Sequence, residues 1–128
     1  MVQAVESEAN MIIAVDFDKT LSLGTHYPHI GEPNTELISI FNQLQALNHT
    51  IILWTCREGK ELNEAVEWLK NQGLTPDYVN CNVPWLGFDC RKIVADYYID
   101  DCAVHVHDMY KIRAILYDSM LKHNDCQG

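Results

Sequence analysis

Residues able to do chemistry stand directly after three apolar runs of the sequence. Two carboxylates, Asp16 and Asp18, follow the first run and flank the aromatic Phe17. The other two runs are followed by a hydroxyl, a thiol, a guanidinium and a second pair of carboxylates: Thr55, Cys56, Arg57, Asp100 and Asp101. Carboxylate oxygens suit a hard divalent cation such as Mg²⁺, whereas hydroxyl and cationic groups suit phosphate oxygens. These are the residue types that phosphoryl transfer requires.

Each run is short, apolar and partly β-branched, as expected for a buried strand of a parallel sheet. We expect strands at about residues 11–16, 50–54 and 97–99, and a shorter one at 78–80. The carboxyl ends of parallel strands share one edge, where open α/β sheets bind their ligands. Period-two geometry would also direct the side chains of Asp16 and Asp18 to the same side of the first strand.

Helical patterns separate the predicted strands. We expect helices at about residues 35–47, 58–72, 91–95 and 108–122. Asn34 or Thr35 can cap the first of these helices, and Gly73 is placed to end the second. Strands that alternate with helices predict the α/β class, here a single doubly wound parallel sheet in a Rossmann-like domain with right-handed crossovers.

Length and composition fit one domain. A chain of 128 residues is long enough to bury roughly two-thirds of its unfolded surface. We expect the domain at residues 11–123, with tails at 1–10 and 124–128. The net charge of −9 argues against a nucleic-acid or acidic-membrane partner. No apolar run approaches the roughly 18 residues that a membrane span needs.

The cysteines predict a reducing compartment. Their number is odd, five, and the acidic residues 1–10 are unlike a signal peptide, so we expect reduced thiols and a cytoplasmic location. A zinc cluster is the alternative, built from Cys81, Cys90, Cys102, His105 and His107. Paired Cys-x-x-Cys knuckles are missing from this spacing, which favours structural or incidental cysteines.

The motifs, taken together, resemble a known superfamily. In chain order they are Asp16-x-Asp18-x-Thr20, an apolar strand ending in Thr55, then Lys92, then Asp100-Asp101. This order is similar to that of the haloacid dehalogenase (HAD) superfamily of phosphohydrolases, over residues 11 to about 101. Each motif alone has low specificity, whereas four in order at strand ends are specific. The resemblance implies a HAD-like fold and a Mg²⁺-dependent phosphatase that forms an aspartyl-phosphate.

The resemblance also implies roles for the acidic residues. Asp16 would be the nucleophile and a Mg²⁺ ligand, and Asp18 would be the general acid/base, with its backbone carbonyl on the metal. Asp100 would bind the metal directly, and Asp101 would do so through water or hold that shell. The residue after the second Asp is commonly Gly in this superfamily and is Lys19 here, which affects the local turn and leaves the chemistry intact.

The remaining motif residues would contact the substrate. Thr55 would hold the phosphoryl group and Lys92 would offset its charge, with Arg91 as the competing phosphate partner. The candidate substrate-binding residues at these positions are Thr20, Thr55, Cys56, Arg57 and Lys92.

The spacing between motifs leaves no room for the cap domain of larger superfamily members, so the chain resembles the small capless branch. Open sites of that branch often meet large substrates or are covered by a neighbouring subunit. Two loops remain to shape the entrance: residues 22–34, which contain His26 and His29, and residues 81–90, which contain Trp85, Leu86 and Phe88. We expect the second loop to pack against a second subunit, in a homo-oligomer, or across the bound substrate.

A regulatory module without turnover is the alternative function. Receiver domains also combine an acidic cluster, a Thr and a Lys on a doubly wound sheet. Their acidic pair closes the first strand and their phospho-acceptor ends a later one. This chain has Asp16 and Asp18 after the first strand and the acidic pair late, which favours the enzyme.

Overall fold

The computed structural model describes residues 10–24, 26–87, 92–100, 112–118 and 120–121 of the chain. In chain order the elements are β1 (Ile12–Val15), α2 (Thr35–Ala46), β2 (Thr50–Leu53), α3 (Gly59–Asn71), β3 (Tyr78–Val79), the short 3-10 helix η1 (Pro84–Leu86) and β4 (Tyr97–Ile99). Residues 112–118 are also helical. Among the described residues, no helix has the length and apolar character needed to cross a bilayer.

The four strands form one sheet in which every neighbouring pair is parallel, in the order β3-β2-β1-β4. The chain runs outward from β1 through β2 to β3, and then returns to pair β4 with the other side of β1. The sheet is therefore wound in two directions from β1, and the predicted α/β class with a parallel sheet is confirmed. The winding reverses between β1 and β4, which is where doubly wound sheets bind ligands.

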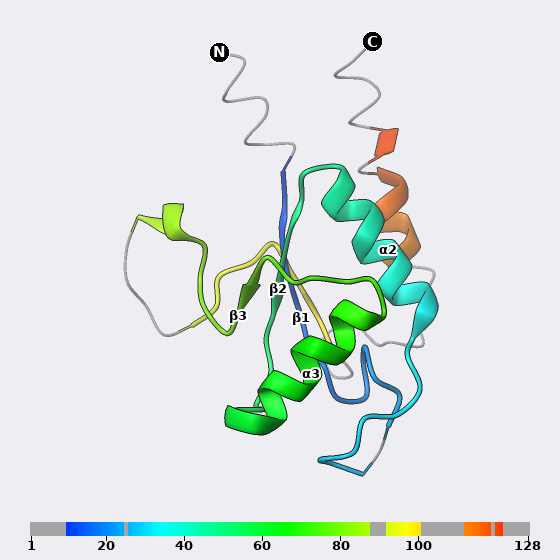
Figure 1. Cartoon of the computed structure of the whole chain (residues 1–128). Coiled ribbons are helices and arrows are strands. Elements are labelled where there is room, and N and C mark those ends of the chain that lie inside the picture. Colours follow the sequence, from blue (N-terminus) through cyan, green and yellow to red (C-terminus); the bar gives the residue numbers. More distant parts are fainter. Residues whose placement is uncertain (1–9, 25, 88–91, 101–111, 119, 122–128) are drawn as a thin grey trace.

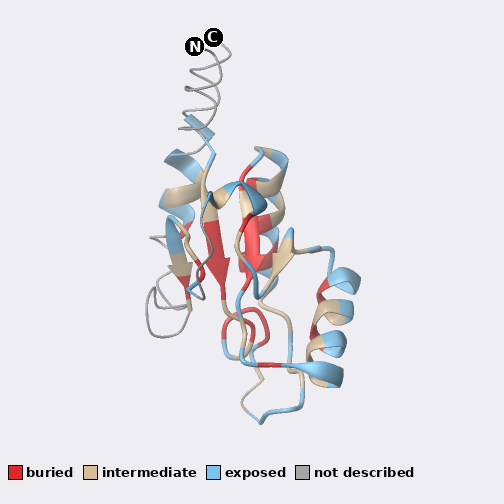
Figure 2. Cartoon of the chain, turned by 90° about the vertical axis from the view of Figure 1, so that its left-hand side faces the viewer, coloured by how far each residue is buried: buried red, intermediate tan, exposed pale blue. Residues whose placement is uncertain are grey.

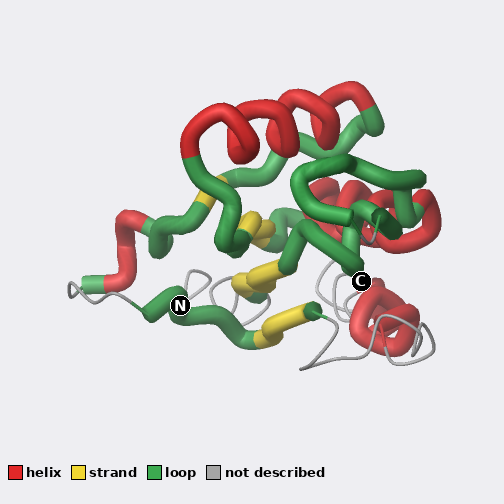
Figure 3. The backbone as a smooth tube through the Cα atoms, turned by 90° about the horizontal axis from the view of Figure 1, so that it is seen from below, coloured by secondary structure: helices red, strands yellow, loops and turns green. Residues whose placement is uncertain are grey.

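The two faces of the sheet are covered differently. Figure 1 shows α2, α3 and the helix at residues 112–118 on one side, with η1 on the other, and the view from below in Figure 3 agrees. The helical side holds the larger core, in which alternate strand residues such as Ile13, Val15 and Ile51 meet Phe41 and Leu69 of the helices. Buried residues accordingly lie in the strands and on the helix surfaces that face them (Figure 2).

The opposite face has a smaller core around Ala14 and Ile52, closed by Val83 and Ile93. A helical turn was predicted at residues 91–95. That prediction is wrong for residues 92–95, which contain no helix, and Arg91 lies outside the described residues.

Side chains explain why residues 92–95 stay extended. The Asn82 amide donates to the Lys92 carbonyl over 2.8 Å and accepts from the Val94 N–H over 2.7 Å. The Tyr98 hydroxyl donates to the Ile93 carbonyl over 2.6 Å and accepts from the Ala95 N–H over 3.2 Å. Because side chains satisfy these backbone groups, the segment needs no helical hydrogen bonds.

The residues predicted to cap α2 and to end α3 are confirmed. The Asn34 side chain accepts a hydrogen bond from the Leu37 N–H over 3.3 Å, which caps α2. Gly73 follows α3 with φ +96°, a conformation that costs glycine little and other residues more. The next residue, Leu74, donates its N–H to the Leu69 carbonyl over 2.9 Å and is fully buried, as in the Schellman termination of a helix.

Candidate active site

The strand register brings two of the predicted carboxylates to neighbouring positions. Val15 pairs with Leu53 on β2 and with Ile99 on β4. Asp16 and Asp100 follow Val15 and Ile99 directly, and the ladder continues, since the Asp16 N–H donates to the Ile99 carbonyl over 2.9 Å. Neighbouring strands lie about 4.8 Å apart, so Asp16 and Asp100 share the edge at which the winding reverses. Both are half-buried, and Asp101 lies outside the described residues.

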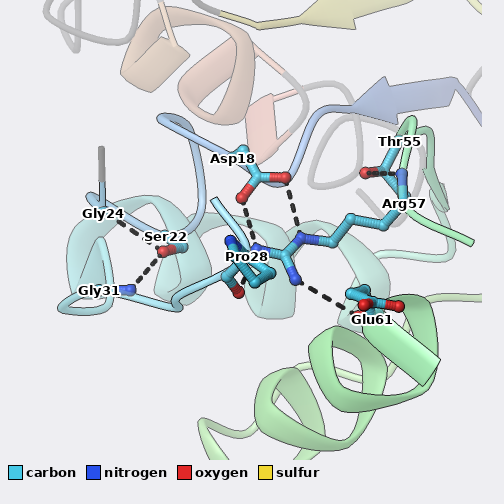
Figure 4. A network of polar contacts seen from close by, with 8 residues as sticks. All are labelled: Asp18, Ser22, Gly24, Pro28, Gly31, Thr55, Arg57 and Glu61. Carbon is cyan, nitrogen blue, oxygen red and sulfur yellow. Dashed lines mark hydrogen bonds and ion pairs between the residues drawn. The ribbon is translucent and has the colours of Figure 1, made fainter. Parts of the chain in front are cut away.

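The carboxylate of Asp18 is held by Arg57 from the neighbouring strand end. Arg57 donates through Nε to Oδ2 over 2.9 Å and through Nη2 to Oδ1 over 2.7 Å (Figure 4). Two parallel charge-assisted hydrogen bonds fix both the position and the plane of a carboxylate. The hydrogen bonds that Arg57 donates to Asp18 raise the pKa of the Arg57 guanidinium, although burial opposes this shift. The Asp18 side chain remains 32% exposed, whereas that of Arg57 is fully buried.

Arg57 also joins the loop after β1 to the start of α3. Its guanidinium lies over the Phe17 ring at 4.9 Å from the centroid and over the Tyr27 ring at 5.0 Å. It donates to the Pro28 carbonyl over 3.2 Å and, through Nη1, to the Glu61 carbonyl over 3.4 Å. The sequence suggested Arg57 as a substrate-binding residue. The structure places its side chain beneath the surface, as the residue that holds Asp18.

The turn after Asp18 is compact, and apart from the exposed Lys19 its residues are buried. The carbonyl of Phe17 accepts hydrogen bonds from the N–H groups of Thr20, Leu21 and Ser22, over 3.2, 3.0 and 3.0 Å. Lys19 lies in this turn with φ +65°, in the left-handed region that favours glycine. Thr20 was expected to contact substrate. Its side chain is instead fully buried, and Oγ1 has no hydrogen-bond partner.

In the predicted loop at residues 22–34, hydrogen bonds join the start of the loop to its end. Ser22 Oγ accepts hydrogen bonds from the N–H of Gly24 over 3.3 Å and of Gly31 over 2.9 Å (Figure 4). The Leu23 N–H donates to the Glu32 carbonyl over 2.8 Å. Gly24 and Gly31 therefore form the closed neck of a narrow loop, here called the narrow loop. Its Tyr27 and Pro28 are the residues that contact Arg57.

Thr55 follows β2, which pairs with β1 on the side opposite to β4. It therefore lies on the other side of Asp16 from Asp100. Its Oγ1 accepts a hydrogen bond from the Arg57 N–H over 3.1 Å, and its own N–H donates to Asn80 Oδ1 over 2.8 Å. An oxygen that accepts one hydrogen bond keeps its O–H for donation, so Thr55 retains a donor for a phosphoryl oxygen. The support from Asn80 was not predicted, and its signal in the sequence is a polar residue directly after the short β3. Cys56, the next residue, is exposed.

Lys92 lies on the extended segment that covers the smaller core. Its neighbour Ile93 packs in that core against Ala14, two residues before Asp16 on the same strand. Side chains two apart on a strand share a face, so the segment that contains Lys92 covers the face of the sheet on which Asp16 lies. Lys92 is exposed.

The loop expected to close the site has its own aromatic contact. Trp85 is 63% exposed and packs edge-to-face on Tyr78, with ring centroids 6.2 Å apart. Leu86 contacts the smaller core, and Phe88 lies outside the described residues. The two loop histidines, His26 and His29, are exposed.

The donor set at the edge fits Mg²⁺. Within the described part of the chain, no three His, Cys, Asp or Glu side chains are grouped so as to hold a metal ion. Mg²⁺ needs fewer protein ligands, commonly one or two carboxylates, with water and substrate oxygens in the other positions. Asp16 and Asp100 supply two carboxylates from the ends of neighbouring strands, the number that Mg²⁺ commonly takes. Of the alternative zinc ligands, Cys81 is free and exposed, and Cys90, Cys102, His105 and His107 lie outside the described residues.

The fold and the site define an α/β protein whose polar groups gather where its parallel sheet reverses direction. A similar solved structure is described as the "Structure of the conserved protein coded by locus from Bacteroides thetaiotaomicron", with 38% sequence identity and a TM-score of 0.69. The match covers 82% of this chain and 90% of that one. The chain therefore belongs to the family of this conserved bacterial protein. No protein-family model and no curated protein matched the sequence.

Proposed function

We propose that the protein is a Mg²⁺-dependent phosphatase of the HAD type, which hydrolyses a phosphate monoester through an aspartyl-phosphate. The observation that carries this proposal is the register of β1 and β4, which places Asp16 and Asp100 side by side where the sheet reverses direction. Two half-buried carboxylates at neighbouring strand ends repel each other unless a cation lies between them. A divalent metal would balance the two carboxylates, and the metal and Lys92 together would balance the negative charge of a bound phosphate.

The first half of the reaction transfers the phosphoryl group to Asp16. A carboxylate oxygen of Asp16 attacks phosphorus, and the bond from phosphorus to the ester oxygen breaks. The leaving oxygen takes its proton from Asp18, which acts as the general acid. Each oxygen of Asp18 that accepts from Arg57 has a second lone pair able to carry this proton. Arg57 can therefore orient Asp18 while a lone pair on each carboxyl oxygen stays available for the proton.

The second half releases phosphate. Asp18 accepts a proton from water, the water oxygen attacks phosphorus, and the bond to Asp16 breaks to give inorganic phosphate and the free carboxylate. Bound Mg²⁺ would supply positive charge against the oxygens of the transferring group. Asp16, Asp100 and the Asp18 carbonyl would hold it. The Thr55 hydroxyl and the Lys92 ammonium would donate to the same phosphoryl oxygens.

The test compares Asp16→Asn with Asp118→Asn, a matched change of an exposed carboxylate on the helix at residues 112–118. Phosphate release from small monoesters is measured with Mg²⁺ and with a chelator. Wild type and Asp118→Asn should turn over only with the metal, and Asp16→Asn should be inactive. Mass spectrometry of acid-quenched wild type should find a phosphorylated Asp16 peptide. Phosphorylation of an aspartate in Asp16→Asn would overturn the nucleophile assignment.

Two further variants separate the roles of the other carboxylates. Asp18→Asn should slow both half-reactions by about 10²–10⁴, with Mg²⁺ affinity retained because the backbone carbonyl remains. Asp100→Asn should weaken Mg²⁺ binding in a calorimetric titration. A titration like that of wild type would remove Asp100 from the metal site. A stable phospho-enzyme without phosphate release in wild type would favour the phospho-accepting module over the enzyme.

A further inference from the structure

Trp54 places an exposed indole beside the candidate nucleophile. It follows β2 directly, and its N–H donates to the Val15 carbonyl over 2.8 Å, so the ladder between β1 and β2 continues through Trp54 and Asp16. Large apolar side chains at such positions are usually covered. The Trp54 side chain is 41% exposed.

The indole lies on the same face of the sheet as Asp16. Ala14 and Ile52 pair in register and both belong to the smaller core. Asp16 and Trp54 stand two residues beyond them, and side chains two apart on a strand share a face. By the same alternation Asp100 lies on this face, two residues after Tyr98.

A second aromatic residue holds the indole in place. The rings of Trp54 and Tyr98 meet edge-to-face, with centroids 5.7 Å apart and planes at 64°. Trp54 follows β2 and Tyr98 belongs to β4, and these two strands lie on opposite sides of β1 and both pair with Ala14. The small side chain of Ala14 therefore lets the two rings meet across β1. The hydroxyl of Tyr98 is anchored to the Ile93 carbonyl over 2.6 Å, so the ring supporting Trp54 is itself fixed.

We propose that Trp54 is the platform for the leaving group, and that the substrate is a phosphate monoester with a planar ring close to its ester oxygen. This inference rests on the proposed function for its reaction and deepens it by naming the substrate class. An aromatic ring that is already rigid and partly exposed gains a stacking contact without losing side-chain freedom. A phosphate held by Asp16, Thr55 and Lys92 would leave its ester group above the face that carries Trp54. A planar leaving group there would stack on the indole.

The experiment compares phenyl phosphate with cyclohexyl phosphate, which are alike in size and differ in planarity. The two esters differ in intrinsic reactivity, but that difference cancels when each variant is divided by wild type for the same ester. Trp54→Leu should lower kcat/KM for phenyl phosphate about fivefold or more, and for cyclohexyl phosphate less than about twofold. Trp54→Phe keeps an aromatic face and the contact with Tyr98, so it should retain most of the preference and guards against simple misfolding.

Binding provides a second measurement that does not depend on turnover. Calorimetry of Asp16→Asn with each ester should show tighter binding of phenyl phosphate, and Trp54→Leu in that background should abolish the difference. If wild type hydrolyses neither ester while this difference in binding persists, the phosphatase proposal fails and the role of Trp54 stands. An equal loss for both esters, a loss for neither, or no binding of either ester overturns the inference. It is also overturned if Trp85→Leu removes the preference and Trp54→Leu does not.

Discussion

Arg57 binds Asp18 through two hydrogen bonds of similar length, 2.9 and 2.7 Å, which its fully buried guanidinium donates. The two residues belong to the ends of different strands, 39 positions apart in the chain. The pair therefore fixes the turn after β1 against the start of α3. It also fixes the orientation of the carboxylate proposed as acid and base.

A double-mutant cycle with Arg57→Gln and Asp18→Asn should show a strong coupling in the free energy of unfolding. Removing one partner leaves the other charged, buried or half-buried, and without an opposite charge beside it. Bidentate hydrogen bonds between charged groups are also strong. We expect a coupling of about 2 kcal/mol from urea denaturation. The exposed pair of Lys60 and Glu64, at 3.9 Å, is the matched control and should couple by no more than about 0.5 kcal/mol. Equal coupling in the two pairs would contradict the prediction.

The coupling between Arg57 and Asp18 should not change between pH 7 and pH 10. Asp18 raises the pKa of Arg57, and a raised pKa stabilises the fold at every pH below the ordinary value of the group. That contribution is lost only as the pH rises through the raised value, which lies above this range. The cycle repeated at the two pH values is the check. A coupling that decayed by pH 10 would contradict the assignment of the interaction to the charged guanidinium of Arg57.

Lys19→Gly should stabilise the protein. The positive φ of Lys19 costs a residue with a Cβ about 1–2 kcal/mol, and glycine avoids this cost while adding some freedom to the unfolded chain. The expected net gain is about 0.5–1 kcal/mol in the free energy of unfolding. Lys19→Ala removes the same charge and keeps the Cβ, so it should give no gain. Similar gains in both variants would assign the effect to charge.

Thr20→Val should be neutral or stabilising. Thr20 Oγ1 is fully buried without a hydrogen-bond partner, and a methyl group of similar shape removes the cost of its desolvation, about 1 kcal/mol. Thr20→Ser keeps the hydroxyl and removes the methyl, so it should destabilise by leaving a small cavity. Thermal unfolding measures both. A valine variant that keeps its stability but loses phosphatase activity would restore Thr20 to the substrate site.

Gly31→Ala should disrupt the narrow loop whose neck is formed by Gly24 and Gly31. A Cβ at Gly31 would lie 2.3 Å from the N and 2.4 Å from the Cα of Gly24, so the backbone would have to separate and weaken the hydrogen bonds to Ser22. Overpacking of this kind costs about 1–3 kcal/mol. Gly87→Ala, where nothing lies within 4 Å of the new Cβ, tests the strain of a positive φ alone. A smaller loss of stability in Gly31→Ala than in Gly87→Ala would show that the two sides of the narrow loop can separate at little cost.

The strands and their common edge were predictable because their signals are local. Unbroken apolar runs ending in Asp16, Thr55 and Asp100 specify buried parallel strands, and the rule that carboxyl ends share an edge does the rest. The extended path of residues 92–95 was not predictable. It depends on hydrogen bonds from Asn82 and Tyr98, and no pattern within the segment itself reports them.

The candidate site could be proposed from the sequence as a set of residues and not as a set of contacts. Asp18 and Arg57 were both identified, but their pairing depends on how two loops leave neighbouring strands. The burial of Thr20 follows from the turn that gathers three N–H groups on the Phe17 carbonyl. The exposure of Trp54 was also hidden, because an apolar residue at the end of an apolar run is indistinguishable from the rest of that run.

The position of β4 at the edge of the sheet connects ligand binding to local opening. In the part of the chain that the structure describes, Asp100 is placed beside Asp16 by a strand of three residues, Tyr97–Ile99, paired with β1. Any ligand that bridges these two carboxylates would resist the detachment of β4, by an amount that grows with ligand concentration over its dissociation constant. The amide proton of Asp16, bonded to the Ile99 carbonyl, would then exchange with solvent more slowly in the presence of that ligand. A single backbone proton would thus report the occupancy of the site.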